Sequence, residues 1–331
     1  MLLLFYYNKE FIMNLEGGLA MKLRKMLMLG LIVLSSVQLL GNDNQKKVEI
    51  GVTQIVEHPS LDLSRKGFEA ALKDKGIDAN IEFANAQGDF STAQMIAKGF
   101  VDKKKVLIFT ISTPSSQAAY NATKEIPIII TAVTDPHAAG LIGQNITGTS
   151  DQLPIKEQLE LVKELMPNIK KIGLIYNTSE QNSIISIGKV KDESKKIGLE
   201  SVESGVTSIN DIGPALDSLL GQVDMVFLTT DNLVVSSMAL VMEKANRANK
   251  PVFASTEDQI PMGALMTKTI DFYQIGYRAG EMAAEIIGGK EVSSIPIELP
   301  KNNLIIINKK VAEKYNINMN LEILENAKIV E

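Results

Sequence analysis

The sequence predicts an α/β fold with two doubly wound parallel-sheet lobes joined by three hinge crossings. From Lys46 onward, short apolar runs rich in β-branched residues alternate with amphipathic helical stretches, a pattern typical of parallel sheets. The apolar runs form two consecutive series, and each series is sufficient for one sheet. The chain has 331 residues, which is long for a single core and suits two lobes.

Several of the strand candidates are continuous apolar runs, as expected for parallel strands that are buried on both faces. The first series consists of residues 48–56, 81–84, 106–111 and 127–133. The second series consists of residues 171–176, 200–206, 225–229 and 251–254, with 264–270 as one further candidate.

Helices are expected between these strands. The stretch 60–75 ends before Gly76, and glycine commonly follows the last turn of a helix. In 154–166 and in 235–245 the apolar residues recur along one helical face, which indicates that these faces pack against a core.

Three crossings between the lobes follow from the order of the elements. The turn-rich stretch 145–152 separates the two series, so the first crossing is expected near Ser150. A helix rich in Gly and Ala after Asp271 could return to the first lobe, and a strand near 304–307 could go back to the second after a crossing near Glu291. Closely spaced crossings favour a hinge over a flexible tether. The expected lobes are 45–150 with 272–291, and 151–271 with 292–331.

The N-terminal part has the layout of a targeting segment. Residues 21–41 begin with a basic stretch, continue with the apolar run 26–34 and end where polar sequence starts at Asn42. This pattern predicts a secretory signal peptide, with cleavage near Gly41 or Asn42. An uncleaved anchor is the alternative, because no clear small-x-small cleavage site is present. We expect residues 1–20 to be an extension upstream of the true start at Met21.

Composition argues against several classes of function. The net charge is −5 and no basic stripe is present, which argues against nucleic-acid binding. The chain has no cysteine and two histidines, which excludes disulfides, thiol nucleophiles and multi-histidine metal cages. We find no nucleophile elbow, phosphate-binding loop, dinucleotide fingerprint or zinc-protease motif. His58 and His137 lie beside prolines, where surface or capping roles are favoured. We therefore expect no enzyme activity, no metal and no cofactor.

Polar residues follow the carboxyl ends of the predicted strands, where doubly wound sheets bind ligands. Ser112 and Thr113 follow one strand, Thr134 follows the next, and Asp231 follows a strand of the second series. Hydroxyls beside a helix N-terminus can seat a carboxylate, and an acidic side chain can receive an ammonium. The group therefore suits a zwitterion, although at each single position helix capping is the commoner role. Tyr176 could stack on a ligand or pack at its strand end.

Five segments carry a resemblance to a known family. They are GVTQIVEHPSLD (51–62), TAVTDPHAAGLI (131–142), NITGTSD (145–151), YNTSEQNS (176–183) and LTTDN (228–232). Residues 48–299 resemble the ABC transporter substrate-binding proteins whose characterised members take up tryptophan and other aromatic amino acids. The resemblance implies the type I periplasmic-binding-protein fold and closure of the lobes on the ligand.

The resemblance also implies roles for the candidate residues. By analogy with branched-chain amino-acid receptors of this fold, the hydroxyls of Ser112, Thr113 and Thr134 would bind the ligand carboxylate. Asp231 would bind its amine. The segment 176–183 would close over the ligand, and Gln54 would line the side-chain end. The candidate ligand-binding residues are Gln54, Ser112, Thr113, Thr134, Tyr176, Asn177, Ser179, Asn182, Ser183, Asp231 and Asn232.

The function implied is that of an extracytoplasmic solute-binding protein of an ABC importer. It would bind an aromatic amino acid, with tryptophan or phenylalanine favoured, and deliver it to a membrane permease. We expect a periplasmic monomer without a lipid anchor, because the lipid-bearing cysteine is absent. Alternatives are a sugar, a nucleoside or another small solute on the same fold; the low aromatic content of 5% argues against a sugar.

Overall fold

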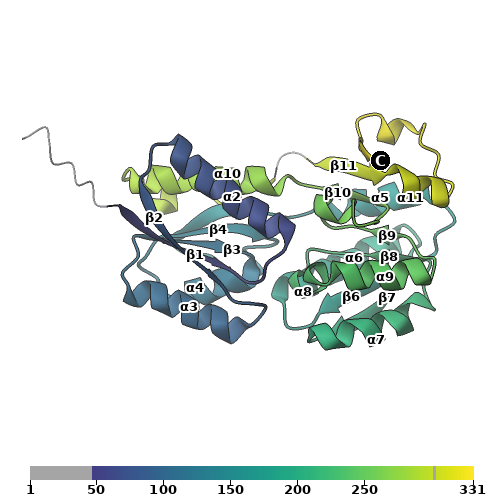
Figure 1. Ribbon diagram of the computed structural model, residues 1–331, viewed down its shortest axis with the longest axis horizontal. Coiled ribbons are helices and arrows are strands. Elements are labelled where there is room, and N and C mark those ends of the chain that lie inside the picture. Colours follow the sequence, from purple (N-terminus) through teal and green to yellow (C-terminus); the bar gives the residue numbers. More distant parts are fainter. Residues whose placement is uncertain (1–46, 301–302) are drawn as a thin grey trace, which may run out of the picture. The chain divides into compact units, whose positions relative to one another are not determined.

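The computed structural model describes residues 47–300 and 303–331 (Figure 1). The expected extension 1–20 and signal peptide 21–41 lie outside the described residues. In the described part of the chain, no helix combines the length and the apolar character needed to cross a membrane.

The first sheet has five parallel strands in the order β2-β1-β3-β4-β5. They are β1 (Val48–Gln54), β2 (Ala79–Asn85), β3 (Leu107–Ile111), β4 (Ile128–Val133) and β5 (Ile146–Ser150). The first four match the predicted strands. The sequence did not predict β5, because its residues ITGTS lack an apolar run; hydroxyl contacts hold it instead, including one between Thr131 and Thr149 at 2.9 Å.

Two pairs of helices cover the two faces of this sheet, α2 with α10 and α3 with α4 (Figure 1). They are α2 (Pro59–Asp74), α3 (Phe90–Asp102), α4 (Thr113–Ala122) and α10 (Phe272–Ile287). α2 and α10 approach so closely that their contact requires glycine. A Cβ at Gly276 would lie 1.9 Å from the backbone oxygen of Ser64, and one at Gly67 would lie 2.1 Å from that of Tyr273.

The second sheet has seven strands in the order β12-β11-β10-β9-β8-β6-β7. They are β6 (Lys171–Asn177), β7 (Glu200–Val206), β8 (Met225–Phe227), β9 (Val252–Phe253), β10 (Met266–Thr269), β11 (Leu304–Asn308) and β12 (Lys328–Val330). All neighbours are parallel except β10 and β11. β11 can lie antiparallel because it returns from the other lobe. The short β12 was not predicted.

Helices cover both faces of the second sheet. The α-helices are α5 (Ile155–Leu165), α6 (Gln181–Lys196), α7 (Ile209–Leu220), α8 (Asn232–Ser236), α9 (Met238–Arg247) and α11 (Lys309–Lys314). The short 3₁₀ helices of the chain are η1 (Glu257–Gln259), η2 (Val292–Ser294) and η3 (Glu322–Leu324). Adjacent strand residues Leu174 and Ile175 belong to separate apolar clusters, so a core lies on each face of this sheet. The predicted fold of two parallel-sheet lobes is confirmed.

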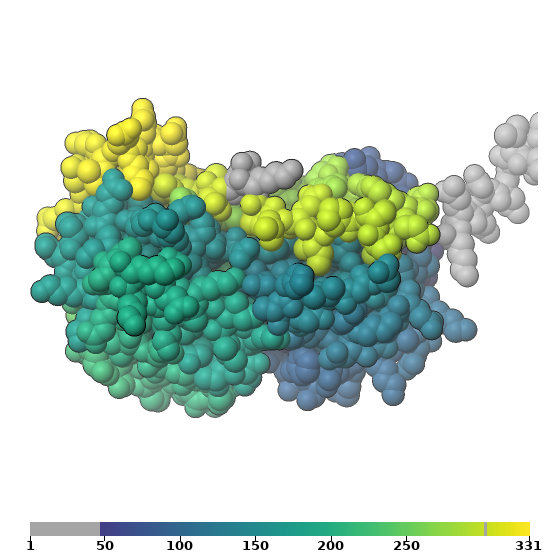
Figure 2. All heavy atoms as spheres, turned by 180° about the vertical axis from the view of Figure 1, so that it is seen from behind, coloured from purple at the N-terminus to yellow at the C-terminus, as the bar shows by residue number. Residues whose placement is uncertain are grey.

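The third crossing comes later than the sequence suggested. Ile295 belongs to the core of the first lobe, and Glu298 forms a β-bridge with Thr149. Residues 292–298 therefore remain beside the first sheet, beyond the crossing expected near Glu291. Figure 2 shows the yellow-green segment around α10 lying over the first lobe and the yellow C-terminal residues lying over the second.

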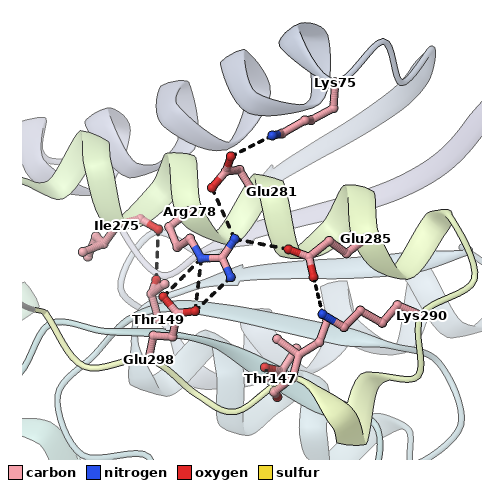
Figure 3. A network of polar contacts seen from close by, with 10 residues as sticks. Lys75, Thr147, Thr149, Ile275, Arg278, Glu281, Glu285, Lys290 and Glu298 are labelled. Atoms are coloured by element: carbon pink, nitrogen blue, oxygen red, sulfur yellow. Dashed lines mark hydrogen bonds and ion pairs between the residues drawn. The ribbon is translucent and has the colours of Figure 1, made fainter.

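A cluster of ion pairs around Arg278 holds residues 292–298 in place (Figure 3). Nε of Arg278 on α10 lies 3.1 Å from both carboxylate oxygens of Glu298, and Nη2 lies 2.9 Å from one of them. Glu281 and Glu285 also accept hydrogen bonds from Arg278. Bidentate pairs of this kind are directional as well as charged. They therefore fix residues 292–298 against α10 before the chain crosses to the second lobe.

Candidate functional site

The carboxyl ends of the first sheet gather polar side chains at one edge. Gln54 ends β1, Ser112 follows β3, Thr134 follows β4 and Asp151 follows β5. Because these strands are parallel neighbours in one sheet, their carboxyl ends meet at the same edge of that sheet. Gln54 is held within its own lobe, since its Nε2 donates to the Val56 oxygen at 2.9 Å.

The start of α4 is a strained turn that carries free hydroxyls. Ser112 has φ 90° and ψ 161°, a backbone region that is essentially reserved for glycine and that is found at functional sites. The Oγ of Ser112 and Oγ1 of Thr113 are buried and have no hydrogen-bond partner among the described residues. Since the first N–H groups of a helix favour negative charge, this turn can receive an anionic group.

Two buried carboxylates organise the facing edge of the second lobe. Asp231 caps α8, because its Oδ1 accepts from the Val234 N–H at 2.9 Å. Its Oδ2 accepts from the Asn177 N–H at 2.5 Å. Burial, together with the negative charge of Glu180, raises the pKa of Asp231. Both oxygens of this carboxylate are thus used within the second lobe.

Glu180 is the second of these carboxylates, and the sequence analysis did not single it out. Its oxygens accept from the backbone N–H groups of Asn232 and Leu233, at 3.1 and 3.2 Å. They also accept from the side-chain amides of Asn177 and Asn182, at 3.1 and 3.2 Å. A glutamate after a predicted strand usually reads as solvent-exposed, so no sequence signal marked it as buried.

The remaining second-lobe candidates differ in their positions. The Ser183 hydroxyl accepts from Asn182 Nδ2 at 3.4 Å and acts to lower the pKa of Asp231. The Ser179 N–H donates to Asn177 Oδ1 at 2.9 Å, within a local turn. The Tyr176 hydroxyl points to Glu203 on β7, at 3.4 Å. Tyr176 and Ser179 therefore make their contacts within the second lobe.

A small cavity lies between residues of the two lobes. From the first lobe it is lined by His58, Leu61, Ala132, Asp151 and Phe272, and from the second by Asn182, Thr230, Asn232, Val235 and Thr256. Its volume is about 10 Å³, which is room for about one water molecule. Asn182 and Asn232 are the sequence candidates that reach it. Thr134 lines a neighbouring cavity and contacts Thr230 across the lobes at 3.1 Å.

The polar atoms around this cavity are unusual because several lack partners. His58 Nδ1, Asp151 Oδ1, Asn182 Oδ1 and Thr256 Oγ1 are buried without a hydrogen bond among the described residues. Buried polar groups in folded proteins are nearly always paired. Four residues that line one cavity, two from each lobe, carry such atoms, which makes this edge suited to a small polar ligand.

Two of these residues correct or extend the sequence analysis. His58 was expected at the surface or in a cap. It does occupy the N-cap position of α2, where its backbone oxygen accepts from the Asp62 N–H at 3.1 Å, but the residue is only 8% exposed and its side chain makes no capping bond. Burial lowers the pKa of His58, so the neutral imidazole is favoured. Asp151 was not a candidate. It is 3% exposed, and burial raises its pKa from 3.8 to about 6, with a hydrogen bond from Thr134 acting in the opposite direction.

Further contacts join the rims of the two lobes. The Lys189 ammonium lies 3.0 Å from Asp135, and Gln181 Nε2 donates to the Ala138 oxygen at 2.6 Å. Ser60 on α2 donates to Asp258 of the second lobe. Because these contacts join residues of the two lobes, separation of the lobes would have to break them.

Comparison with known proteins decides the family. A family model described as ABC transporter substrate binding protein matches residues 49–331. The chain belongs to this family. It is therefore a substrate-binding protein and not an enzyme, and the resemblance seen in the sequence is confirmed. In the described residues, no group of three or more acidic or histidine side chains could hold a metal ion.

Individual relatives are similar over most of the chain. A tyrosine-binding protein of Clostridioides difficile (strain R20291) is 50% identical over 277 residues, which are 81% of this chain and 80% of that protein. A Streptococcus pneumonia ABC domain in complex with L-Trp is 33% identical, with a TM-score of 0.82, and the match covers 85% of this chain and 100% of that one. A ligand-free, open substrate binding protein with adhesive properties from Clostridium difficile is 41% identical, with a TM-score of 0.64, covering 86% and 99%.

Proposed function

We propose that this protein binds an aromatic amino acid between its lobes, outside the cytoplasm, and delivers it to the permease of an ABC importer. The observation that carries the proposal is the set of unpartnered buried polar atoms on residues of both lobes that line one cavity. The tyrosine-binding relative and the L-Trp complex support an aromatic ligand.

The zwitterionic part of the ligand matches the chemistry of this edge. The free hydroxyls of Ser112 and Thr113 at the start of α4 suit the ligand carboxylate. Asn182 and Asn232 would close on the ligand from the second lobe, since both line the cavity. Thr134 would help to close the site through its contact with Thr230.

Binding requires the lobes to separate and close again. The open relative is more similar in sequence than the L-Trp complex, 41% against 33%, yet its TM-score is lower, 0.64 against 0.82. This contrast supports a closed arrangement of the lobes in the present structure. A cavity of about 10 Å³ is too small for an amino acid, so the ligand would enter the open form.

Isothermal titration calorimetry tests the proposal. The purified chain is unfolded and refolded to remove carried-over ligand and is then titrated with L-tyrosine, L-tryptophan and L-phenylalanine. We expect binding of at least one of the three with a stoichiometry of one, and weaker binding of L-leucine. Absence of binding to all the aromatic amino acids would overturn the proposed ligand class.

Delivery and location need separate experiments. In cells that express the chain with its own N-terminus, we expect the processed protein in the extracytoplasmic fraction. Deletion of its gene should reduce uptake of the radiolabelled amino acid that it binds. Unchanged uptake in a strain without other transporters for that amino acid would contradict the role in import.

A further inference from the structure

Asp151 provides the carboxylate of the cavity between the lobes. Among the residues that line this cavity, it is the one with an acidic side chain. Its Oδ1 is buried and has no hydrogen-bond partner in the described part of the chain. The Thr134 hydroxyl acts on this carboxyl group by lowering its pKa, and the unpartnered oxygen is left for a donor of the ligand.

We propose that Asp151 binds the ammonium group of the amino-acid ligand. This inference rests on the proposed function and names the residue that recognises the amine. A primary ammonium is a compact cation with three donors, and a buried carboxylate oxygen without a partner is its natural counterpart. No Lys or Arg of the described residues forms an ion pair with Asp151, so its negative charge is left for the ligand.

The position of Asp151 in the chain suits this role. It directly follows β5, at the first crossing between the lobes, and its own N–H donates to the Val133 oxygen of β4 at 3.2 Å. Its backbone is therefore tied to the first sheet, which also presents the hydroxyls of Ser112 and Thr113. Both charged ends of a zwitterion can then be recognised by one lobe before the second lobe closes.

Asp231 is less suited to the ammonium, although it is the carboxylate that the strand-end pattern favoured. Both of its oxygens accept bonds from backbone N–H groups of the second lobe, and it does not line the cavity. Its charge also lies beside Glu180, with which it shares the N-terminus of α8. Replacing Asp231 would also remove the cap of α8 and disturb this helix, which carries Asn232 at the cavity.

The test measures whether the ammonium and Asp151 recognise each other. Wild type and Asp151→Asn, each stripped of ligand, are titrated with L-tyrosine and with 3-(4-hydroxyphenyl)propanoate, which lacks the ammonium. For wild type, loss of the ammonium should weaken binding about tenfold or more. For Asp151→Asn, L-tyrosine should lose a similar factor, whereas the propanoate should bind as it does to wild type or more tightly.

Controls separate this inference from the proposed function. Asp224→Asn makes the same change at the opposite edge of the second sheet, where Asp224 accepts from the Lys170 and Lys171 N–H groups at 2.9 Å, and should leave the affinity for L-tyrosine unchanged. Equal affinity of wild type and Asp151→Asn for L-tyrosine overturns the inference, as does an equal loss for both ligands. If wild type binds no aromatic amino acid, the proposed function itself fails. Should Asp151→Asn not fold, a wild type that binds both ligands equally would still overturn the inference.

Discussion

Asp151 should destabilise the ligand-free protein at neutral pH, and replacing it with asparagine should stabilise that form. Its pKa rises from 3.8 to about 6 on folding because the carboxylate is buried. Between these two values the folded state holds more protons than the unfolded state, so the free energy of unfolding falls as the pH rises through this window. A shift of about two units corresponds to about 3 kcal/mol.

Urea unfolding of the ligand-free wild type and Asp151→Asn at pH 4 and pH 8 measures this effect. Asparagine keeps the shape of the side chain and has no charge to bury. The free energy of unfolding of the variant, relative to that of wild type, should increase by up to about 3 kcal/mol from pH 4 to pH 8. The titration of His58, which Asp62 and Asp258 also influence, is present in both proteins and largely cancels in the difference. A variant that is less stable than wild type by the same amount at both pH values would refute the reasoning.

Three further substitutions test other parts of the structure. Gly276→Ala should lower the free energy of unfolding, measured by thermal melts, by about 1–3 kcal/mol because α2 and α10 must move apart. The control Gly188→Ala, which has open space around it, should be neutral or stabilising in the same melts. Glu298→Gln should lower it by about 1 kcal/mol through loss of the pair with Arg278; a loss that does not shrink in high salt would contradict an ionic origin. Ser112→Gly should be more stable than Ser112→Ala by about 1 kcal/mol in urea, since glycine relieves the strained backbone; equal stability would show that Ser112 is not strained.

Much of the fold could be predicted because its strands are buried on both faces. Such strands read as continuous apolar runs, which is how β3 and β4 were found. The strand β5 could not be found in this way, because Thr147 and Thr149 satisfy their hydroxyls inside the lobe. The late third crossing also depends on tertiary contacts, above all on the pair between Arg278 and Glu298.

The gathering of polar strand ends at one edge of each sheet could be predicted from the sequence, since topology alone brings them there. That these residues bind the ligand remains a prediction. The partners of each side chain depend on packing that one sequence does not display. Asp231 has the capping geometry that was weighed against ligand binding, and Glu180 is buried only because five donors surround it. Asp151 lay in a stretch that was read as a connection.

A crystal structure of the protein with L-tyrosine tests the central claim most directly. We expect the amino acid between the lobes, with its ammonium nitrogen within hydrogen-bond distance of Asp151 Oδ1 and its carboxylate at the hydroxyls of Ser112 and Thr113. An ammonium bound to Asp231 instead, or a ligand that does not contact both lobes, would contradict the account.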